Sequence, residues 1–250
     1  MTGRERAVAA GSALLGVGAW WAVAAAVGPL LLPSPLAVAA VFGKEAGMLA
    51  SAALQTGLAA CGGLVLASLL GVAAAAAAWW SAALRLALRP YVVLVQVVPI
   101  VAIAPMLLVW LGYGRGVALT TAAIAAFYPV YSAASTGLVA PTADLVDLYR
   151  LLGASRWREL TGLRAWAALP ALFSGLRTAG GLSVIGAIVG EFVGSNGSPP
   201  TLGYTVLFAS RSAHADRAFA AIVVAGALAL GIGQIIGFAE RKLVGRWYGA

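Results

Sequence analysis

The sequence has one cysteine, one histidine and few charged side chains. Cys61 cannot form an internal disulfide, and together with His214 it cannot supply the ligands of a zinc site. Only 10% of the 250 residues are charged, against about 25% in a typical soluble domain, so a soluble surface could not be covered. The eight acidic residues are scattered and form no cluster of titratable groups, which argues against an integral membrane enzyme.

In place of charges, the chain has long apolar blocks. Hydrophobic residues make up 62% of the sequence and occur in uncharged runs of about 20 residues, the length at which a helix spans a bilayer. We therefore predict an all-α, polytopic membrane protein with a single transmembrane domain over residues 1–250. The predicted spans are residues 7–28, 51–80, 91–111, 117–139, 170–193 and 218–238.

Two of these spans carry further predictions. The first follows Arg4 and Arg6 but is longer than the apolar core of a signal peptide, about 7–15 residues, so we expect it to remain uncleaved. Pro99 and Pro105 interrupt the third span. Because neighbouring protein must satisfy the backbone groups that proline frees inside a membrane, we expect this span to be buried in the bundle.

The distribution of positive charge predicts the orientation. The formal net charge is +8, from 16 Lys and Arg residues against eight acids. With six spans and a cytoplasmic N-terminus, twelve basic residues, including Arg246, lie inside; the four outside are Lys44, Arg115, Arg211 and Arg217. This excess satisfies the positive-inside rule with both termini cytoplasmic. Because the basic residues form short, separate clusters, we expect contacts with anionic lipid and none with nucleic acid.

Small residues also recur at helix-packing spacing. Gly186, Gly190 and Gly194 form two overlapping GxxxG steps, and Gly233 and Gly237 form another. Glycines at this spacing let the backbones of two membrane helices approach closely. We expect these faces to be helix contacts.

The one long polar segment is residues 141–166, which is cytoplasmic by the charge count. It is charged and partly amphipathic, so a short helix there could lie across the membrane surface and offer residues to a soluble partner. An ordinary loop anchored at the interface would have the same composition. The chemistry of the segment alone leaves both possibilities open.

Within this segment, residues 147–157 (Asp-Leu-Tyr-Arg-Leu-Leu-Gly-Ala-Ser-Arg-Trp) resemble the EAA loop of bacterial ABC importer permeases. Asp147 stands at the acidic position of that pattern, Gly153 stands at its glycine, and Leu169-Pro170 matches its distal Leu-Pro. In this family the loop forms the coupling helix, which fits into a groove of the ATPase subunit.

Further stretches resemble the nitrate/sulfonate/taurine-type permeases in their order and spacing. They are residues 33–35 (Pro-Ser-Pro), 96–99 (Gln-Val-Val-Pro), 110–114 (Trp-Leu-Gly-Tyr-Gly), 190–194 (Gly-Glu-Phe-Val-Gly) and 202–204 (Leu-Gly-Tyr). The chain departs from the family pattern at Leu148 and Tyr149, which replace two small residues, and at Trp166, which stands where a proline is usual.

The resemblance implies a type I ABC importer permease-like bundle of six helices in the bacterial inner membrane. It implies four kinds of contact: two copies of an ATPase subunit, a second permease copy in a homodimer, an extracytoplasmic solute-binding protein, and membrane lipid. The chain has no Gly-x4-Gly-Lys-Ser/Thr loop, so ATP and Mg are expected on the ATPase subunit. We expect this chain to be no enzyme and to bind no cofactor or metal.

The resemblance also assigns an ATPase-coupling role to Asp147, Arg150, Gly153, Ala154, Ser155, Arg156 and Trp157. A helix N-terminus carries partial positive charge, so we expect Asp147 to lie at the start of the coupling helix. Gly153 permits a tight turn or a close backbone approach. The arginines can reach acidic groups on a partner or anionic lipid.

Polar groups inside the spans often mark a translocation path. The candidates are Gln96, Tyr128, Ser183 and Glu191. Gln96 could instead form an interhelical hydrogen bond, and Glu191 could be solvated at the outer end of its helix. The solute would be nitrate/sulfonate/taurine-like, or a thiamine precursor or riboflavin. The alternative is a secondary transporter or channel working without an ATPase, which would require paired intramembrane carboxylates, whereas Glu191 stands alone.

Overall fold

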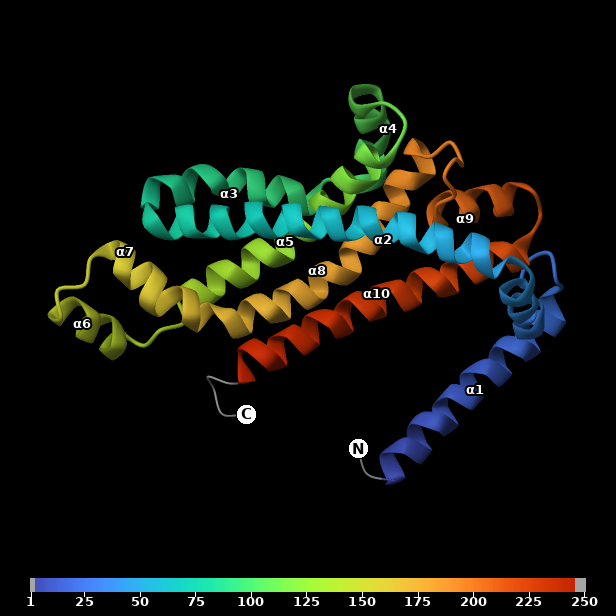
Figure 1. The fold of residues 1–250 in the computed structure, drawn as a ribbon, viewed down its shortest axis with the longest axis horizontal. Coiled ribbons are helices and arrows are strands. Elements are labelled where there is room, and N and C mark those ends of the chain that lie inside the picture. Colours follow the sequence, from blue (N-terminus) through green and yellow to red (C-terminus); the bar gives the residue numbers. More distant parts are fainter. Residues whose placement is uncertain (1–2, 246–250) are drawn as a thin grey trace.

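The computed structural model describes residues 3–245, and these form helices with no strand. The elements are α1 (Gly3–Val27), α2 (Pro35–Trp80), α3 (Ala82–Val97), α4 (Ile100–Leu111), α5 (Arg115–Leu138), α6 (Ala143–Leu151), α7 (Arg156–Glu159), the π-helical turn η1 (Leu160–Arg164), α8 (Ala165–Gly194), α9 (Leu202–Arg211) and α10 (Ala215–Leu243) (Figure 1). The all-α class is confirmed. Arg246, which the charge count placed inside, lies outside the described residues.

Four helical segments are long and apolar enough to cross a membrane. They are α2, α5, the continuous segment Arg156–Gly194, and α10; the bent pair of α3 and α4 gives a fifth if it is one span. In α1 the apolar part found among the described residues is Leu14–Val27, which is shorter than a full span. The chain is thus a multi-pass membrane protein, but the predicted count of six spans is not confirmed.

α2 begins earlier than the span predicted at 51–80. The Ser34 hydroxyl caps its N-terminus by accepting a hydrogen bond from the Ala37 N–H at 3.2 Å, and Pro35 stands at the first helical position. The helix then runs for 46 residues to Trp80 with one kink at Glu45, whose φ of −123° and ψ of 22° are not helical. At this kink the Glu45 carboxylate pairs with Arg217 of α10.

The predicted third span is wrong in shape and in burial. α3 and α4 meet at 102°, because the chain is extended at Val98 and Pro99 between them. A residue before proline is pushed out of the helical region, and proline itself donates no hydrogen bond, so the helix stops there. Most of the pair is open: Val109 is 77% exposed and Val97 is 70% exposed. Pro99 therefore makes a corner between two helices, whereas Pro105 lies within α4.

The segment between the last two predicted spans contains a helix that the sequence pattern does not predict. α9 begins after Thr201, whose hydroxyl accepts a hydrogen bond from the Tyr204 N–H at 3.3 Å. The helix runs for 10 residues and packs against α8 and α10 at one end of the bundle (Figure 1).

The centre of the fold is the packing of α5 against α8, and glycines set their separation. A Cβ atom at Gly190 would lie 2.6 Å from the Cα of Ala118, and one at Gly186 would lie 2.6 Å from the Thr121 carbonyl oxygen. Gly194 approaches the Val117 side chain in the same way. The predicted contact role of these three glycines is confirmed, because only residues without a Cβ allow this approach.

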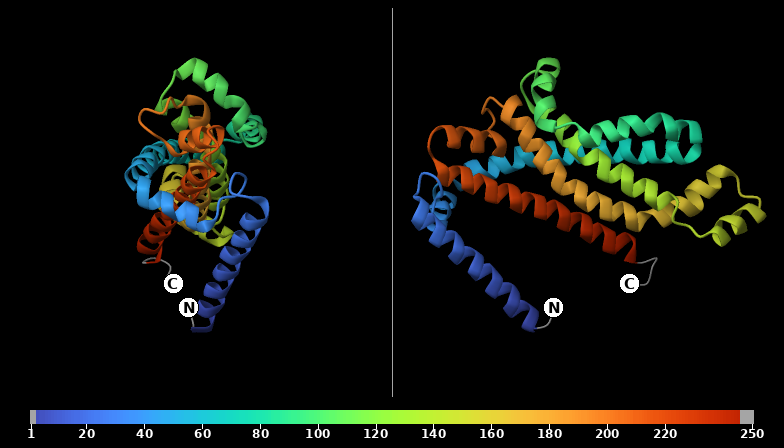
Figure 2. Two further views of the ribbon diagram at one scale, coloured as in Figure 1. Left: turned by 90° about the vertical axis from the view of Figure 1, so that its right-hand side faces the viewer. Right: turned by 180° about the vertical axis from the view of Figure 1, so that it is seen from behind.

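α2 covers one face of the α5–α8 pair, and α10 packs along α8 and α2. In Figure 2, the segment formed by α6, α7 and η1 projects beyond the C-terminal end of α10, while α1 diverges from the bundle. Gly233 and Gly237 of α10 do not meet another helix backbone; they face the side chain of Arg177. The predicted close approach of helices at that pair is therefore wrong.

Candidate functional site

The predicted coupling segment forms two short helices joined by a tight turn. α6 ends at Leu151 with Leu152 as its C-cap, and Gly153 follows with a positive φ of 70°. The Gly153 N–H donates to the Arg150 carbonyl and the Ala154 N–H donates to the Tyr149 carbonyl, both at 3.0 Å. This is a Schellman helix end, which requires the left-handed conformation at the glycine. The predicted turn at Gly153 is confirmed.

The predicted position of Asp147 at the helix start is wrong. α6 begins at Ala143, so the acid in its first turn is Asp144, and Asp147 lies one turn later. There its carboxylate forms an exposed ion pair with Arg150 at 3.6 Å, and both side chains are about two-thirds exposed. Asp147 is thus available at the surface but gains little from the helix dipole, which acts within the first turn.

The next part of the segment is attached to the end of α2. The Ser155 hydroxyl caps α7 by accepting from the Arg158 N–H at 3.3 Å. The Arg156 guanidinium lies 5.5 Å from the ring centres of both Trp79 and Trp80. The ring of Trp157 meets Trp80 edge-on at 6.4 Å. Such cation–π and aromatic contacts contribute about 0.5–2 kcal/mol each.

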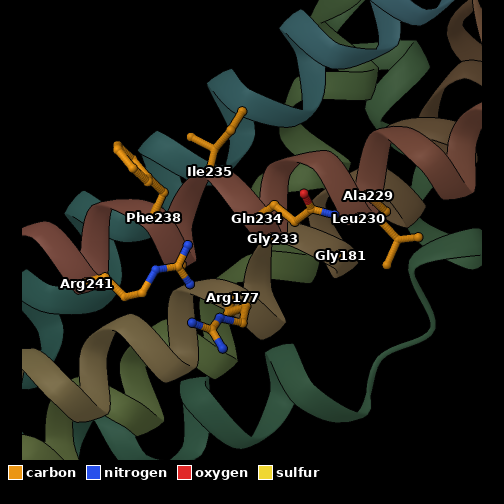
Figure 3. Close-up of a pocket in the computed structure, with 10 residues that line it drawn as sticks. Arg177, Gly181, Ala229, Leu230, Gly233, Gln234, Ile235, Phe238 and Arg241 are labelled. Atoms are coloured by element: carbon orange, nitrogen blue, oxygen red, sulfur yellow. The ribbon is translucent and has the colours of Figure 1, made fainter. Parts of the chain in front are cut away.

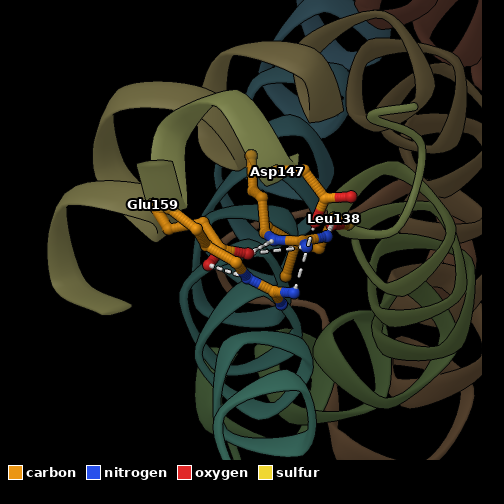
Figure 4. A network of polar contacts seen from close by, with 5 residues as sticks. Leu138, Asp147 and Glu159 are labelled. Carbon is orange, nitrogen blue, oxygen red and sulfur yellow. Dashed lines mark hydrogen bonds and ion pairs between the residues drawn. The ribbon is translucent and has the colours of Figure 1, made fainter. Parts of the chain in front are cut away.

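A buried ion pair anchors the base of this segment. Arg164 donates from Nε to Oε1 of Glu159 at 2.7 Å and from Nη1 to the carbonyl oxygen of Leu138 at 2.8 Å (Figure 4). Its guanidinium also lies 5.0 Å from the Trp79 ring centre. Glu159 and Arg164 are only 5% and 9% exposed. This anchor, which we call the Glu159–Arg164 pair, joins the loop to α2 and α5 at once.

The outer surface of the segment is apolar as well as charged. Leu151 and Leu152 are 86% and 76% exposed, and Trp157 is 62% exposed. These side chains lie in the segment that projects beyond α10 (Figure 2). A cluster of large exposed apolar residues flanked by charges is typical of a protein-binding surface. We call Leu151, Leu152, Trp157 and the exposed Asp147 and Arg150 the loop surface.

The predicted path residues do not gather in one place. Tyr128 lines an open groove of about 520 Å³ between α5 and α8, which we call the polar groove. Ser183 is fully buried in α8 and donates to the Gly180 carbonyl at 2.8 Å, so it does not line this groove. Gln96 is exposed on α3. The other polar residues lining the groove, missed in the sequence, are Ser132, Thr136, Ser174 and Thr178.

Glu191 is the fourth path candidate and is buried rather than solvated. Its Oε2 accepts from the Thr56 hydroxyl at 3.0 Å and from the Gly203 N–H at 2.8 Å. The Thr56 hydroxyl oxygen in turn accepts from the Leu202 N–H at 3.0 Å. The carboxylate therefore connects α8, α2 and the start of α9. The expectation of helix-end solvation is wrong for this residue, which is 3% exposed.

The comparison with known proteins decides the class of this chain. The family described as "Binding-protein-dependent transport system inner membrane component" matches residues 67–248. The chain belongs to this family. The matched region includes the loop surface, the Glu159–Arg164 pair and the polar groove.

Individual relatives of this permease support the family assignment. It is 34% identical over 213 residues to a probable ABC transporter permease protein of Haemophilus influenzae, covering 84% of this chain and 86% of the relative. It is 33% identical to the riboflavin transport system permease protein RibX of Chloroflexus aurantiacus, and the match covers 66% of this chain and 60% of the relative. It is 30% identical to the formylaminopyrimidine transport permease protein ThiX of Halalkalibacterium halodurans, and the match covers 67% of this chain and 68% of the relative.

Sequence reading of the permease missed the Glu159–Arg164 pair for a geometric reason. Side chains five residues apart do not share a face of an α-helix, where neighbours are three or four apart. Here the π-helical turn η1 widens the helix between the two residues and aligns them. The only signal in the sequence is two opposite charges close to an apolar span.

Proposed function

We propose that the permease is the membrane subunit of an ATP-driven importer and that an ATPase subunit binds the loop surface. The exposure of Leu151, Leu152 and Trp157 at the end of the bundle carries this proposal. The excess of basic residues on this side supports a cytoplasmic location for the loop and for both termini. ATP and Mg are then bound by the ATPase subunit, of which two copies serve two permeases.

The anchoring contacts suggest how motion would pass from the ATPase to the membrane. Closure of the ATPase subunits on ATP would displace the loop surface as a rigid body. Arg156 and Arg164 connect that segment to Trp79, and Arg164 also connects it to the Leu138 carbonyl. The displacement would therefore reach α2 and α5 together, rather than α8 alone.

The turn at Gly153 gives a direct test of the loop's role. We expect Gly153→Val to lower ATP-driven uptake at least about fivefold, because a β-branched residue in the left-handed conformation costs about 1–2 kcal/mol and distorts the end of α6. Membrane insertion and the basal rate of ATP hydrolysis should stay at the wild-type level. Uptake and ATPase rates are measured in proteoliposomes containing the full complex.

Gly226→Val is the matched control for this substitution. Gly226 lies in α10, its φ is not positive, and an added Cβ meets no atom within 4 Å. Its uptake should stay near the wild-type rate. Normal uptake by Gly153→Val would count against coupling through this loop.

The polar groove supports a second proposal, that two copies of the permease face each other across it. Tyr128, Ser132, Thr136, Ser174 and Thr178 form a polar stripe that would be unfavourable against lipid. A second copy would cover the stripe and leave a hydrophilic path between the two molecules. This arrangement makes the homodimer, rather than the single chain, the unit that transports the solute.

Cross-linking tests this arrangement. In a Cys61→Ala background, Ser132→Cys should give covalent dimers in membranes with a short bis-maleimide, because the groove would lie near the symmetry axis. Leu70→Cys, on the exposed side of α2, should not. Equal yields for the two positions, or none for Ser132→Cys, would contradict the proposal.

The names of two relatives suggest the class of solute. We propose a small organic solute of the riboflavin or thiamine-precursor type, delivered by an extracytoplasmic binding protein, because RibX and ThiX are named for such compounds. Uptake of labelled riboflavin and formylaminopyrimidine, with taurine as comparison, tests this choice. Transport that proceeds without any ATPase subunit would instead favour a secondary transporter or channel.

A further inference from the structure

An open groove of about 770 Å³ lies between α8 and α10, separate from the polar groove. Its polar lining comes from Arg177 of α8 and from Gln234 and Arg241 of α10. Figure 3 shows both guanidinium groups in the space between the two helices. The groove thus combines two cationic side chains with an amide that can donate hydrogen bonds.

The side chain of Arg177 lies against two glycines of α10. A Cβ at Gly237 would lie 2.8 Å from Nη2 of Arg177, and one at Gly233 would lie 3.8 Å from its Cγ. Because these two glycines have no side chain, they leave room for the Arg177 side chain to lie across α10. Arg177 is held there by Glu240, whose Oε2 is 2.5 Å from Nη2.

The groove carries a net positive charge. Glu240 neutralises one of the two arginines, and Arg241 forms no ion pair with any residue in the described part of the chain. Arg177 keeps further N–H groups beyond the one that meets Glu240, since a guanidinium has five donors. Together with Arg241 it can bind one anionic group bidentately, the geometry that arginine prefers for phosphate.

Apolar side chains of α10 also line this groove. Phe238, Ile235 and Leu230 are 62%, 70% and 69% exposed. Leu230 and Arg241 are separated by about 16 Å along the helix, at 1.5 Å per residue. Arg241 and Lys242 in the last turn of α10 mark the boundary of the membrane. A ligand that fills the groove therefore needs an anionic head at this boundary and a hydrocarbon chain above it.

We propose that this groove binds an anionic phospholipid, with its phosphate between Arg177 and Arg241 and an acyl chain along Phe238 and Leu230. A soluble anion would leave the exposed apolar residues uncovered. The phosphate of an anionic phospholipid pairs with the arginines, and its acyl chain covers the apolar side chains.

The test is lipid retention by the full-length permease purified with its ATPase partner in detergent. Native mass spectrometry measures binding of added phosphatidylglycerol and of phosphatidylcholine. We expect retention of phosphatidylglycerol only, and about tenfold weaker binding after Arg241→Gln. Arg241→Lys keeps the charge but loses the planar fork, so its binding should fall less.

Lys242→Gln is the matched control, because it removes the same charge from the adjacent exposed position outside the groove. It should retain phosphatidylglycerol like the wild type. Equal loss for Lys242→Gln and Arg241→Gln would reduce the effect to general surface charge and overturn the proposal. Equal retention of phosphatidylcholine would do the same.

Two further results would also overturn it, each by identifying another occupant. Displacement of the lipid by excess inorganic phosphate would indicate a site for a soluble anion. Efficient cross-linking between two copies through Ile235→Cys, in the Cys61→Ala background, would indicate that a second permease covers the groove.

Discussion

Replacing Arg164 with glutamine should lower ATP-driven uptake about tenfold and lower the free energy of unfolding by about 3 kcal/mol. The substitution removes the closer of the two cations beside the buried Glu159 carboxylate and leaves only Arg150, whose Nε lies 3.8 Å from Oε2. It also removes the hydrogen bond to the Leu138 carbonyl. It also removes the cation over the Trp79 ring. The loop surface would then lose its attachment to α2 and α5, so ATP hydrolysis would no longer drive movement of the bundle.

Arg158→Gln is the control for Arg164→Gln. Arg158 lies in the same segment but is exposed, and only its backbone N–H forms the helix-capping bond. Its uptake and its melting temperature should stay near those of the wild type. Thermal unfolding of the purified complex and uptake in proteoliposomes provide the two measurements.

A double variant tests whether the effect of Arg164→Gln comes from breaking the ion pair with Glu159. Removing both charges with Glu159→Gln and Arg164→Gln should recover part of the lost stability, because losing both partners of a buried pair costs less than losing one. No difference between the single and double variants would show that the two residues do not act as a pair. Uptake by Arg164→Gln at the wild-type rate would contradict the anchoring role.

The second large effect is expected at the opposite end of the molecule. Glu191→Leu should destabilise the permease by about 3 kcal/mol, because the Gly203 N–H and the Thr56 hydroxyl lose their acceptor in a buried site. α9 would then separate from α8 and α2. Because α9 lies at the end of the bundle opposite the loop surface, stimulation of the ATPase by the proposed binding protein should fall at least about fivefold.

Glu191→Gln tests the same contact more gently. Its amide oxygen can still accept from Gly203 and Thr56, so most of the stability should remain. Melting temperature, and proteolysis at Arg211 at the end of α9, distinguish a detached α9 from an intact one. If the leucine and glutamine variants behave alike, the hydrogen bonds of Glu191 are not what holds α9.

Both predictions involve α2. Thr56 connects this helix to Glu191 and α9, and Trp79 connects it to the proposed coupling segment. The two residues are about 35 Å apart along the helix, at 1.5 Å per residue. One continuous helix therefore contacts both ends of the permease, and its rigidity offers a route between the ATPase side and the solute side.

The class, the membrane setting and the turn of the proposed coupling segment follow from the sequence alone. Scarce charge and long apolar runs require a membrane whatever the packing, because no soluble surface can be made from them. Gly153 was predictable because a left-handed residue after a short amphipathic helix favours glycine. The glycines of α8 were predictable because their spacing places them on one face.

Which polar residues act together depends on how the helices pack in space. The Glu159–Arg164 pair depends on a widened helical turn, Glu191 depends on Thr56 far away in the sequence, and Arg177 depends on two glycines of α10. Local patterns fix the period and the ends of helices, whereas the partner of a buried charge is set by how distant helices meet in space.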